Sequence, residues 1–237
     1  VLEAAKKEME YILKNDISVL TYVDETFPYR LKNCEDAPLL FYYKGDADFN
    51  AQKIISIVGT RNATEYGKQC CKNLINEIKS HNPIIVSGLA FGIDACAHRE
   101  ALSAGLTTIA VLGTQLAKVS PTSHVELAKN ITKQGCVMSE YHSQTIFDSK
   151  LFVRRNRIIA ALSDATIVVE SKAKGGALIT ADFANQYNRD VCAFPGNAGN
   201  KFSQGCNELI KKNKAALIEN GHDLEELLNR SEERRVG

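Results

Sequence analysis

A cluster of cations around one aromatic residue is the feature of this 237-residue sequence with the clearest chemistry. The segment SKLFVRRNRIIAALSD begins at Ser149 and carries four cations within eight residues, with no acidic residue among them: Lys150, Arg154, Arg155 and Arg157. Phe152 and Asn156 lie within the same cluster. Lys and Arg neutralise phosphates, and an aromatic ring offers an unpaired base a surface for stacking. The cluster therefore favours single-stranded nucleic acid over a small anion.

The position of this cluster directly before an apolar run has an energetic consequence. We expect a helix over about residues 153–163, with Lys150 and Phe152 in a cationic loop at its start. Cations near a helix N-terminus oppose the helix dipole, so the arrangement indicates a bound anion or an acidic partner rather than a merely solvated helix start. Lys172 and Lys174 precede a Gly-Gly pair, which adds a backbone nest compatible with phosphate.

The elements that must position these residues alternate between strands and helices. Continuous apolar runs predict strands over 53–59, 83–88, 107–113, 135–140, 165–171, 190–196 and 215–220. Such runs are typical of a parallel sheet that helices cover on both faces. Helical patterns separate them over about 64–81, 92–105, 123–134, 153–163, 177–188 and 204–213. The sequence therefore predicts an α/β fold with a doubly wound, mostly parallel sheet of extended Rossmann-like type.

The two ends of the chain differ from this middle part. Residues 1–50 predict a helix and strand-like runs that form a small N-terminal appendage leading into the sheet. We assign residues 51–221 to the Rossmann-like core and residues 222–237 to a short C-terminal helix with a charged tail. The sequence has no run of about 18 apolar residues and no signal-peptide pattern, so we expect no membrane partner and a cytoplasmic location.

Charge and cysteine content narrow the function further. The net charge is only +1, but residues 54–220 carry 19 Lys and Arg against 13 Asp and Glu, so the positive charge belongs to the middle of the chain. The seven cysteines are scattered and odd in number. We therefore expect reduced thiols and no metal site.

The ends of the predicted strands supply further candidates for the site. In an open α/β sheet, ligands bind beyond the carboxyl ends of the strands. Arg61 follows the first strand of the core, and the loop SGLAFG, with Gly88 and Phe91, follows the second. We expect Arg61 and Arg155 to lie on loops at one rim of the sheet.

Several other chemistries are disfavoured. The segment GTRNATEYG lacks the glycine fingerprint of dinucleotide-binding folds, and the chain has no phosphate loop of the nucleotide hydrolases, so we expect no cofactor. IVSGLAFG does not match the nucleophile elbow of serine hydrolases. Asp94 and His98 lie one helical turn apart, and we expect a structural hydrogen bond between them rather than catalysis.

Several long blocks together resemble the DNA-processing protein A (DprA/Smf) family. They include SIVGTRNATEYG, IVSGLAFGIDACAHREAL, FVRRNRIIAALSDATIVVES and GGALITADFANQYNRDVCAFPG, which follow in family order between about residues 54 and 220. The resemblance implies an extended Rossmann domain that binds single-stranded DNA during natural transformation, when competent cells take up DNA. It also implies protection of that DNA, loading of the RecA recombinase for recombination, a homodimer, and no catalysis.

The resemblance also implies which residues bind the DNA. Matched by position, the basic pocket includes Arg61, the SGLAFG loop, Phe152 and the RNR segment, residues 155–157. The remaining cations nearby complete our set of DNA-binding candidates: Arg61, Gly88, Phe91, Lys150, Phe152, Arg154, Arg155, Asn156, Arg157 and Lys174. One departure from the family pattern is Ser120-Pro121, where many members have Tyr-Pro.

Two alternative functions remain open, and a homodimer is the expected assembly. Nucleotide phosphoribohydrolases of the LOG type share the superfold, but their glycine-rich loop would correspond to KGGALITAD here, in which Asp182 replaces the Glu and one glycine is lost. A nucleotide-binding Rossmann protein is the other alternative. We expect the homodimer to form near NELIKKNKAALI, where Leu209 and Ile210 lie on an apolar stripe before an expected edge strand.

Overall fold

One nine-stranded sheet organises the molecule, which is known here from a computed structural model that describes the backbone of residues 2–236 and the side chains of residues 2–229. The strand order is β1-β2-β6-β5-β4-β3-β7-β8-β9, and all pairs from β6 to β9 are parallel. The strands of this parallel part are β3 (Ile54–Val58), β4 (Ile84–Ser87), β5 (Thr108–Val111), β6 (Cys136–Ser139), β7 (Ala165–Val168), β8 (Asp190–Ala193) and β9 (Ala216–Leu217). All seven strands lie where the sequence predicts them.

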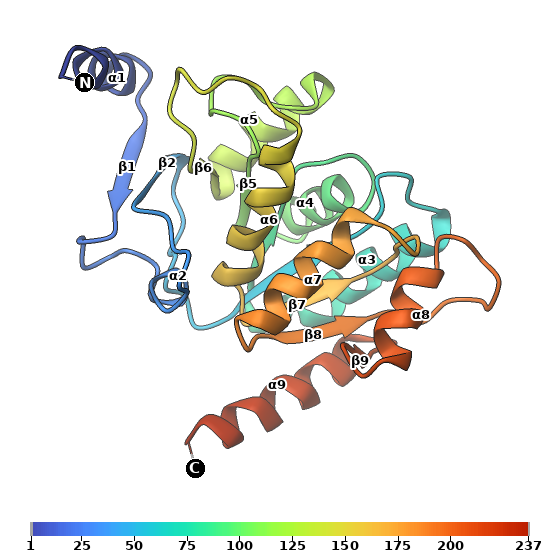
Figure 1. Ribbon diagram of the computed structural model, residues 1–237. Helices are drawn as coiled ribbons and strands as arrows, with labels where there is room; N and C mark the ends of the chain where they lie inside the picture. The colour runs from blue at the N-terminus through green and yellow to red at the C-terminus, as the bar shows by residue number, and fades with distance from the viewer. Residues whose placement is uncertain (1, 237) are drawn as a thin grey trace.

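Helices cover both faces of this sheet (Figure 1). One face packs against α3 (Glu65–Ile78), α4 (Ile93–Ser103), α5 (Val125–Gln134) and α9 (Gly221–Val236). The other packs against α2 (Tyr29–Lys32), α6 (Lys150–Leu162), α7 (Gly176–Gln186) and α8 (Gln204–Lys211). The predicted doubly wound α/β architecture is therefore confirmed, and the buried apolar strands form its two-sided core.

The direction of the strand order reverses at β3. From β3 the chain proceeds through β4 and β5 to β6 on one side, and then returns to place β7 and β8 on the other side. The loops that follow β3 and β7 consequently diverge onto opposite faces and leave a crevice between them. Glu170, just after β7, fastens this region: its carboxylate accepts hydrogen bonds from the backbone N–H and the hydroxyl of Thr64, at 2.9 and 2.6 Å. The Thr64 hydroxyl in turn caps α3 by accepting from Gly67 N–H.

The N-terminal segment extends the sheet. β2 (Leu40–Gly45) pairs antiparallel with β6, the last strand of the parallel part, and β1 (Ser18–Thr21) pairs antiparallel with β2. α1 (Leu2–Lys14) lies beyond them at one corner of the molecule (Figure 1). The short helix α2 fastens this segment to the core. The Arg30 side chain is buried and donates to both carboxylate oxygens of Asp164, at 2.8 and 2.9 Å.

Two expectations about helix ends are wrong. α6 begins at Lys150, three residues earlier than expected, so Lys150 and Phe152 lie in the helix and not in a loop before it. The Lys150 N–H donates to the Asp148 carboxylate at 2.8 Å, which stabilises this helix start. At the C-terminus, α9 continues to Val236 and includes most of the expected tail.

Three general properties complete the fold. Within the described residues, no helix combines the length and the apolarity that crossing a membrane requires. The same residues contain no group of three or more His, Cys, Asp or Glu side chains suited to a metal ion. The seven cysteines are free, and five of them are buried.

Candidate nucleic-acid interface

A cavity of about 340 Å³ opens at the crevice between the loops after β3 and β7. Its floor is the end of β3, and its walls come from the starts of α4 and α7 and from one face of α6. The lining residues are Val58, Gly59, Thr60, Arg61, Asn62, Ala90, Asp94, Ser149, Phe152, Val153, Arg155, Asn156, Ile159, Ser171, Lys172, Gly175, Gly176, Ala177 and Thr180. We call this the central cavity. Four residues predicted for the site, Arg61, Phe152, Arg155 and Asn156, meet there.

Arg155 is the buried cation of the central cavity. Its side chain, in the second turn of α6, is only 4% exposed, so the expectation that it lies on a loop is wrong. Nη1 donates to the carbonyl oxygens of Gly88, at 2.7 Å, and of Val111. Burial is the main cause that lowers the pKa of Arg155 to about 10; within that balance the Asp94 carboxylate raises the pKa and the nearby Arg61 lowers it. The guanidinium therefore remains charged at pH 7 and is held at a fixed place in the cavity wall.

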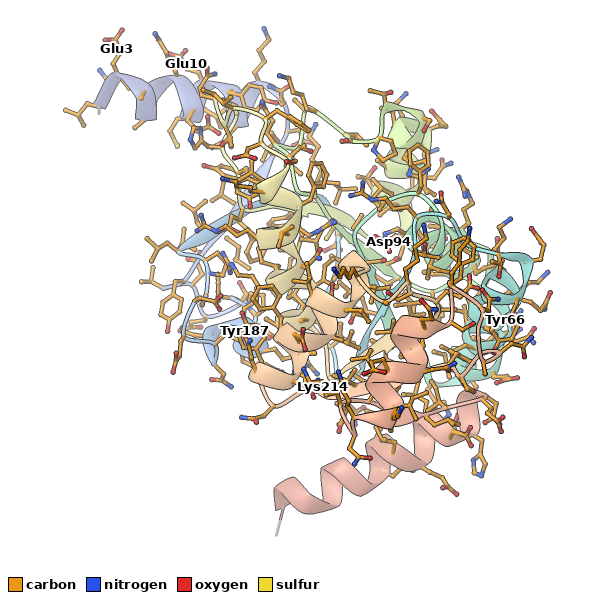
Figure 2. All side chains as sticks on the ribbon, turned by 45° about the vertical axis from the view of Figure 1, so that its right-hand side comes forward. Glu3, Glu10, Tyr66, Asp94, Tyr187 and Lys214 are labelled. Carbon is orange, nitrogen blue, oxygen red and sulfur yellow. The ribbon has the colours of Figure 1, made fainter. Side chains whose placement is uncertain are left out.

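Asp94 is an acidic residue of the lining, at the start of α4. The Ala90 N–H donates to its carboxylate at 3.4 Å. Burial raises the pKa of Asp94, while the Arg155 charge and local hydrogen bonds lower it. The Asp94 side chain, labelled in Figure 2, is buried. The expected hydrogen bond from Asp94 to His98 is absent: His98 Nδ1 bonds to the Thr108 hydroxyl at 2.8 Å, because that hydroxyl lies on β5, which packs against α4.

Phe152 supplies the aromatic surface of the cavity. Its half-buried ring lies against Gly113, where an added Cβ would come within 2.7 Å of the ring, so the glycine permits this close approach. Phe147 contacts the ring edge-on, with centroids 5.9 Å apart. The remainder of the ring borders the cavity, which Arg155 also lines; an exposed aromatic face of this kind is a surface on which an unpaired base can stack.

Two further cations and a helix N-terminus face the same space. Arg61 and Lys172 come from the loops after β3 and β7, and neither forms an ion pair within the described part of the chain. Gly175 and Gly176 begin α7, whose free N–H groups carry a partial positive charge at this end. The cavity thus combines three cations and a helix N-terminus with one aromatic ring.

The other cations of α6 lie on a different face of that helix. Lys150, Arg154 and Arg157 border a separate open hollow, which also includes Asp36 and Phe183. Arg157 is buried there. Its guanidinium pairs with the Glu140 carboxylate and donates to the Asp36 carbonyl at 2.7 Å. The structure therefore places Arg157 in the packing between α6 and the N-terminal segment, outside the central cavity.

The remaining predicted residues surround the central cavity. Gly88 accepts from Arg155 and so supports the wall. Phe91 is 49% exposed, contacts the His124 ring edge-on and borders a neighbouring hollow that shares Arg61 with the central cavity. Lys174 is exposed and lies outside the lining, which contains Lys172 instead.

The set of DNA-binding candidates omitted some lining residues, chiefly Asp94 and also Lys172, which the sequence had indicated only beside the Gly-Gly pair. Lys172 follows the apolar strand β7 more closely than Lys174, and this proximity to a strand's carboxyl end is the signal that could have selected it. Asp94 was considered only as a partner of His98, although it follows the β4 loop that was already a candidate.

Comparison with known proteins agrees with this geometry. The sequence matches the family described as DNA recombination-mediator protein A over residues 18–229. The chain belongs to this family. It is 36% identical to the DNA processing protein DprA of Bacillus subtilis over 216 residues, which cover 91% of this chain and 73% of that protein. Protein Smf of Escherichia coli is 34% identical over 86% of this chain and 54% of its own length.

Solved structures show the same relationship. DprA from Streptococcus pneumoniae superposes with a TM-score of 0.83 at 37% identity, covering 88% of this chain and 73% of that one. DprA from Helicobacter pylori, whose structure concerns its single-stranded DNA binding mode, gives a TM-score of 0.81 at 30% identity. The superposition covers 91% of this chain and 96% of that one. A molybdenum cofactor binding protein from Rippkaea orientalis, at 18% identity and a TM-score of 0.55, shares the fold alone.

Proposed function

We propose that the chain binds single-stranded DNA in the central cavity without reading its base sequence. The observation that carries this proposal is the placement of the Phe152 ring beside the buried Arg155 guanidinium, with Arg61 and Lys172 at the rim of the same cavity. Stacking on an aromatic ring tolerates every base, and fixed cations bind the phosphates on either side. The single-stranded DNA binding named for the Helicobacter pylori relative supports the proposal.

A non-enzymatic role fits this geometry better than hydrolysis of a nucleotide. Glycosidases generally use two carboxylates around the scissile bond, whereas Asp94 is the sole carboxylate among the described residues that line the cavity. Asp182, the counterpart of the Glu in the phosphoribohydrolase loop, pairs with Lys214 at 3.0 Å. Lys214 lies well away from Asp94 in Figure 2. We therefore propose binding without catalysis.

The wider role follows from the family. Bound in this way, incoming single strands would be shielded from nucleases in the cytoplasm during DNA uptake, and then passed to a RecA-type recombinase. The exposed backbone of a strand held at one rim of the sheet leaves its other side accessible to such a partner. These steps form part of the proposal, and a reconstituted strand-exchange reaction with and without this protein tests them.

A homodimer is the proposed assembly. β9 is an edge strand, as expected, and Leu217 on it is 48% exposed. The predicted stripe on α8 contributes less than expected, because Leu209 is buried against its own sheet and Ile210 is half-buried. An edge strand with unpaired backbone groups favours a partner strand. Sedimentation at micromolar concentration tests the dimer, and a monomer would contradict it.

The binding experiment is a titration of labelled oligo-dT at two salt concentrations. Affinity should fall with salt by a slope of about 0.7 per phosphate contact, and it should be lower for duplex of the same length. An assay for free base released from nucleoside monophosphates is run in parallel. Salt-insensitive binding or a preference for duplex would refute the proposed function, and released base would instead support the hydrolase alternative.

A further inference from the structure

A second aromatic ring, outside the central cavity, lies under two ammonium groups. Phe202 is half-buried in the loop between β8 and α8. Nζ of Lys172 and Nζ of Lys201 lie 5.3 and 5.2 Å from its ring centroid. No ion pair between either lysine and an acidic residue occurs in the described part of the chain. Two like charges on one ring repel each other, and a phosphate beside them would offset that repulsion.

This ring is adjacent to the central cavity through Lys172, which lines both places. The loop that carries Phe202 is also held in position. The Asn207 side chain accepts from Gly196 N–H and donates to the Gly196 carbonyl, at 3.1 and 2.9 Å. Gly205 N–H donates to the Ser171 carbonyl at 2.8 Å, which fastens the start of α8 to the segment after β7. Phe202 therefore sits on a preformed surface and costs little entropy to use.

The surface beyond Phe202 is hollowed and polar. A hollow of about 400 Å³ follows along the same loop, lined by Tyr66, Pro195, Gly196, Asn197, Asn200 and Ser203. Amide and hydroxyl groups of this kind hydrogen-bond to phosphate and sugar without selecting a base. No acidic side chain is among these described lining residues, so a polyanion meets no opposing charge there.

We propose that Lys172, Lys201 and Phe202 form a second nucleotide subsite, the Phe202 subsite, where a strand leaving the central cavity stacks another base. The base takes the place of one ammonium group on the ring, and the flexible lysine stem turns that ammonium to the adjacent phosphate. The Phe202 subsite rests on the proposed binding of single-stranded DNA. The subsite also gives the bound strand a direction, because the strand then runs from Phe152 across the start of α7 towards α8.

The sequence contains no tryptophan, so a Phe→Trp substitution creates a single fluorescent reporter. The Phe152→Trp variant reports the central cavity, and the Phe202→Trp variant reports the Phe202 subsite. Each is titrated with oligo-dT from about 4 to about 16 nucleotides, the span of known single-strand sites. We expect quenching at position 152 for every length that binds, and at position 202 only above a threshold length.

Anisotropy with the longest oligonucleotide measures the contribution of the subsite. Phe202→Ala should weaken binding roughly 5- to 150-fold, the range for one stacked base. Phe202→Tyr should retain the wild-type affinity. Lys201→Gln should reduce the salt slope by about 0.7, whereas Lys133→Gln, which removes an exposed charge on α5 at the other face of the sheet, should not.

The outcomes separate the two proposals. Quenching at position 152 with none at 202, together with wild-type affinity for Phe202→Ala, overturns the Phe202 subsite and leaves the proposed function standing. Absence of any binding by wild-type protein at every length overturns both. Equal thermal midpoints for the Phe202→Ala variant and wild type show that lost affinity does not come from unfolding.

Discussion

The absence of a side chain at Gly88 leaves room for the Arg155 guanidinium, so a larger residue at position 88 should displace the guanidinium. An added Cβ at Gly88 would lie 2.5 Å from both Nη1 and Nη2 of Arg155. Favourable contacts between heavy atoms require about 3.5 Å, so the guanidinium must move by roughly 1 Å. That movement breaks the hydrogen bonds to the Gly88 and Val111 carbonyls. Gly88→Ala should therefore cost about 1–3 kcal/mol of unfolding free energy, the usual range for overpacking.

A double-mutant cycle tests this cause directly. In an Arg155→Ala background the obstructing group is gone, and Gly88→Ala should change the unfolding free energy by less than about 0.5 kcal/mol. Urea unfolding followed by circular dichroism gives the four values. Gly176→Ala serves as the stability control, because no atom lies within 4 Å of its added Cβ.

The same four proteins also test the effect of Gly88→Ala on DNA binding. Moving the guanidinium out of the cavity wall should remove one phosphate contact, so the salt slope of oligo-dT binding should fall by about 0.7 in the Gly88→Ala variant. In the Arg155→Ala background the second substitution should leave that slope unchanged. Equal costs of Gly88→Ala in both backgrounds, in stability and in slope, would show that the alanine does not act through Arg155.

Three further predictions concern single residues. Arg61→Ala should weaken DNA binding at an unchanged thermal midpoint. Arg157→Ala should instead cost about 1–3 kcal/mol of stability, because the Glu140 carboxylate loses its nearer partner and keeps, among the described residues, only the exposed Arg154, 3.6 Å away; thermal unfolding beside anisotropy distinguishes the two variants. Phe152→Ala should cost about 1–3 kcal/mol of binding if a base stacks there, and an unchanged isotherm would contradict stacking. Burial lowers the pKa of His98 to about 3, so as the pH falls the unfolded chain binds a proton at this residue at a higher pH than the folded chain does. The free energy of unfolding should therefore fall by about 2 kcal/mol from pH 8 to pH 5. A His98→Asn variant with the same pH dependence as wild type would refute this.

The fold was largely predictable because each strand of the parallel part has a recognisable sequence pattern. These strands are buried on both faces, so each is a continuous apolar run, and the glycines and polar residues after them mark the carboxyl ends where ligands bind. Arg61 and the SGLAFG loop follow from this rule alone. The N-terminal strands were less evident as parts of the same sheet, because the pairing of β2 with β6, which joins them to it, connects segments more than about 90 residues apart.

The chemistry of residues 150–157 was evident from their types, but their division between two sites was not. In a helix, successive residues are about 100° apart. Phe152, Arg155 and Asn156 therefore share the face that lines the central cavity, whereas Lys150, Arg154 and Arg157 share another that borders a different hollow. With Lys150 and Phe152 assigned to a loop before the helix, this periodicity could not be applied to the whole cluster, and its four cations were not told apart.

The sequence by itself determined the order of strands and helices along the chain, the edge of the sheet at which the candidate site lies and the kinds of side chain gathered there. Only the tertiary structure decided which cation lines the central cavity and which pairs with a buried carboxylate. Arg155 and Arg157 differ by two positions, yet one meets the carbonyls of Gly88 and Val111 and the other meets the carboxylate of Glu140. The reason is physical: an arginine's role depends on which acceptors the packing of distant segments brings within reach, and residue type alone does not specify them.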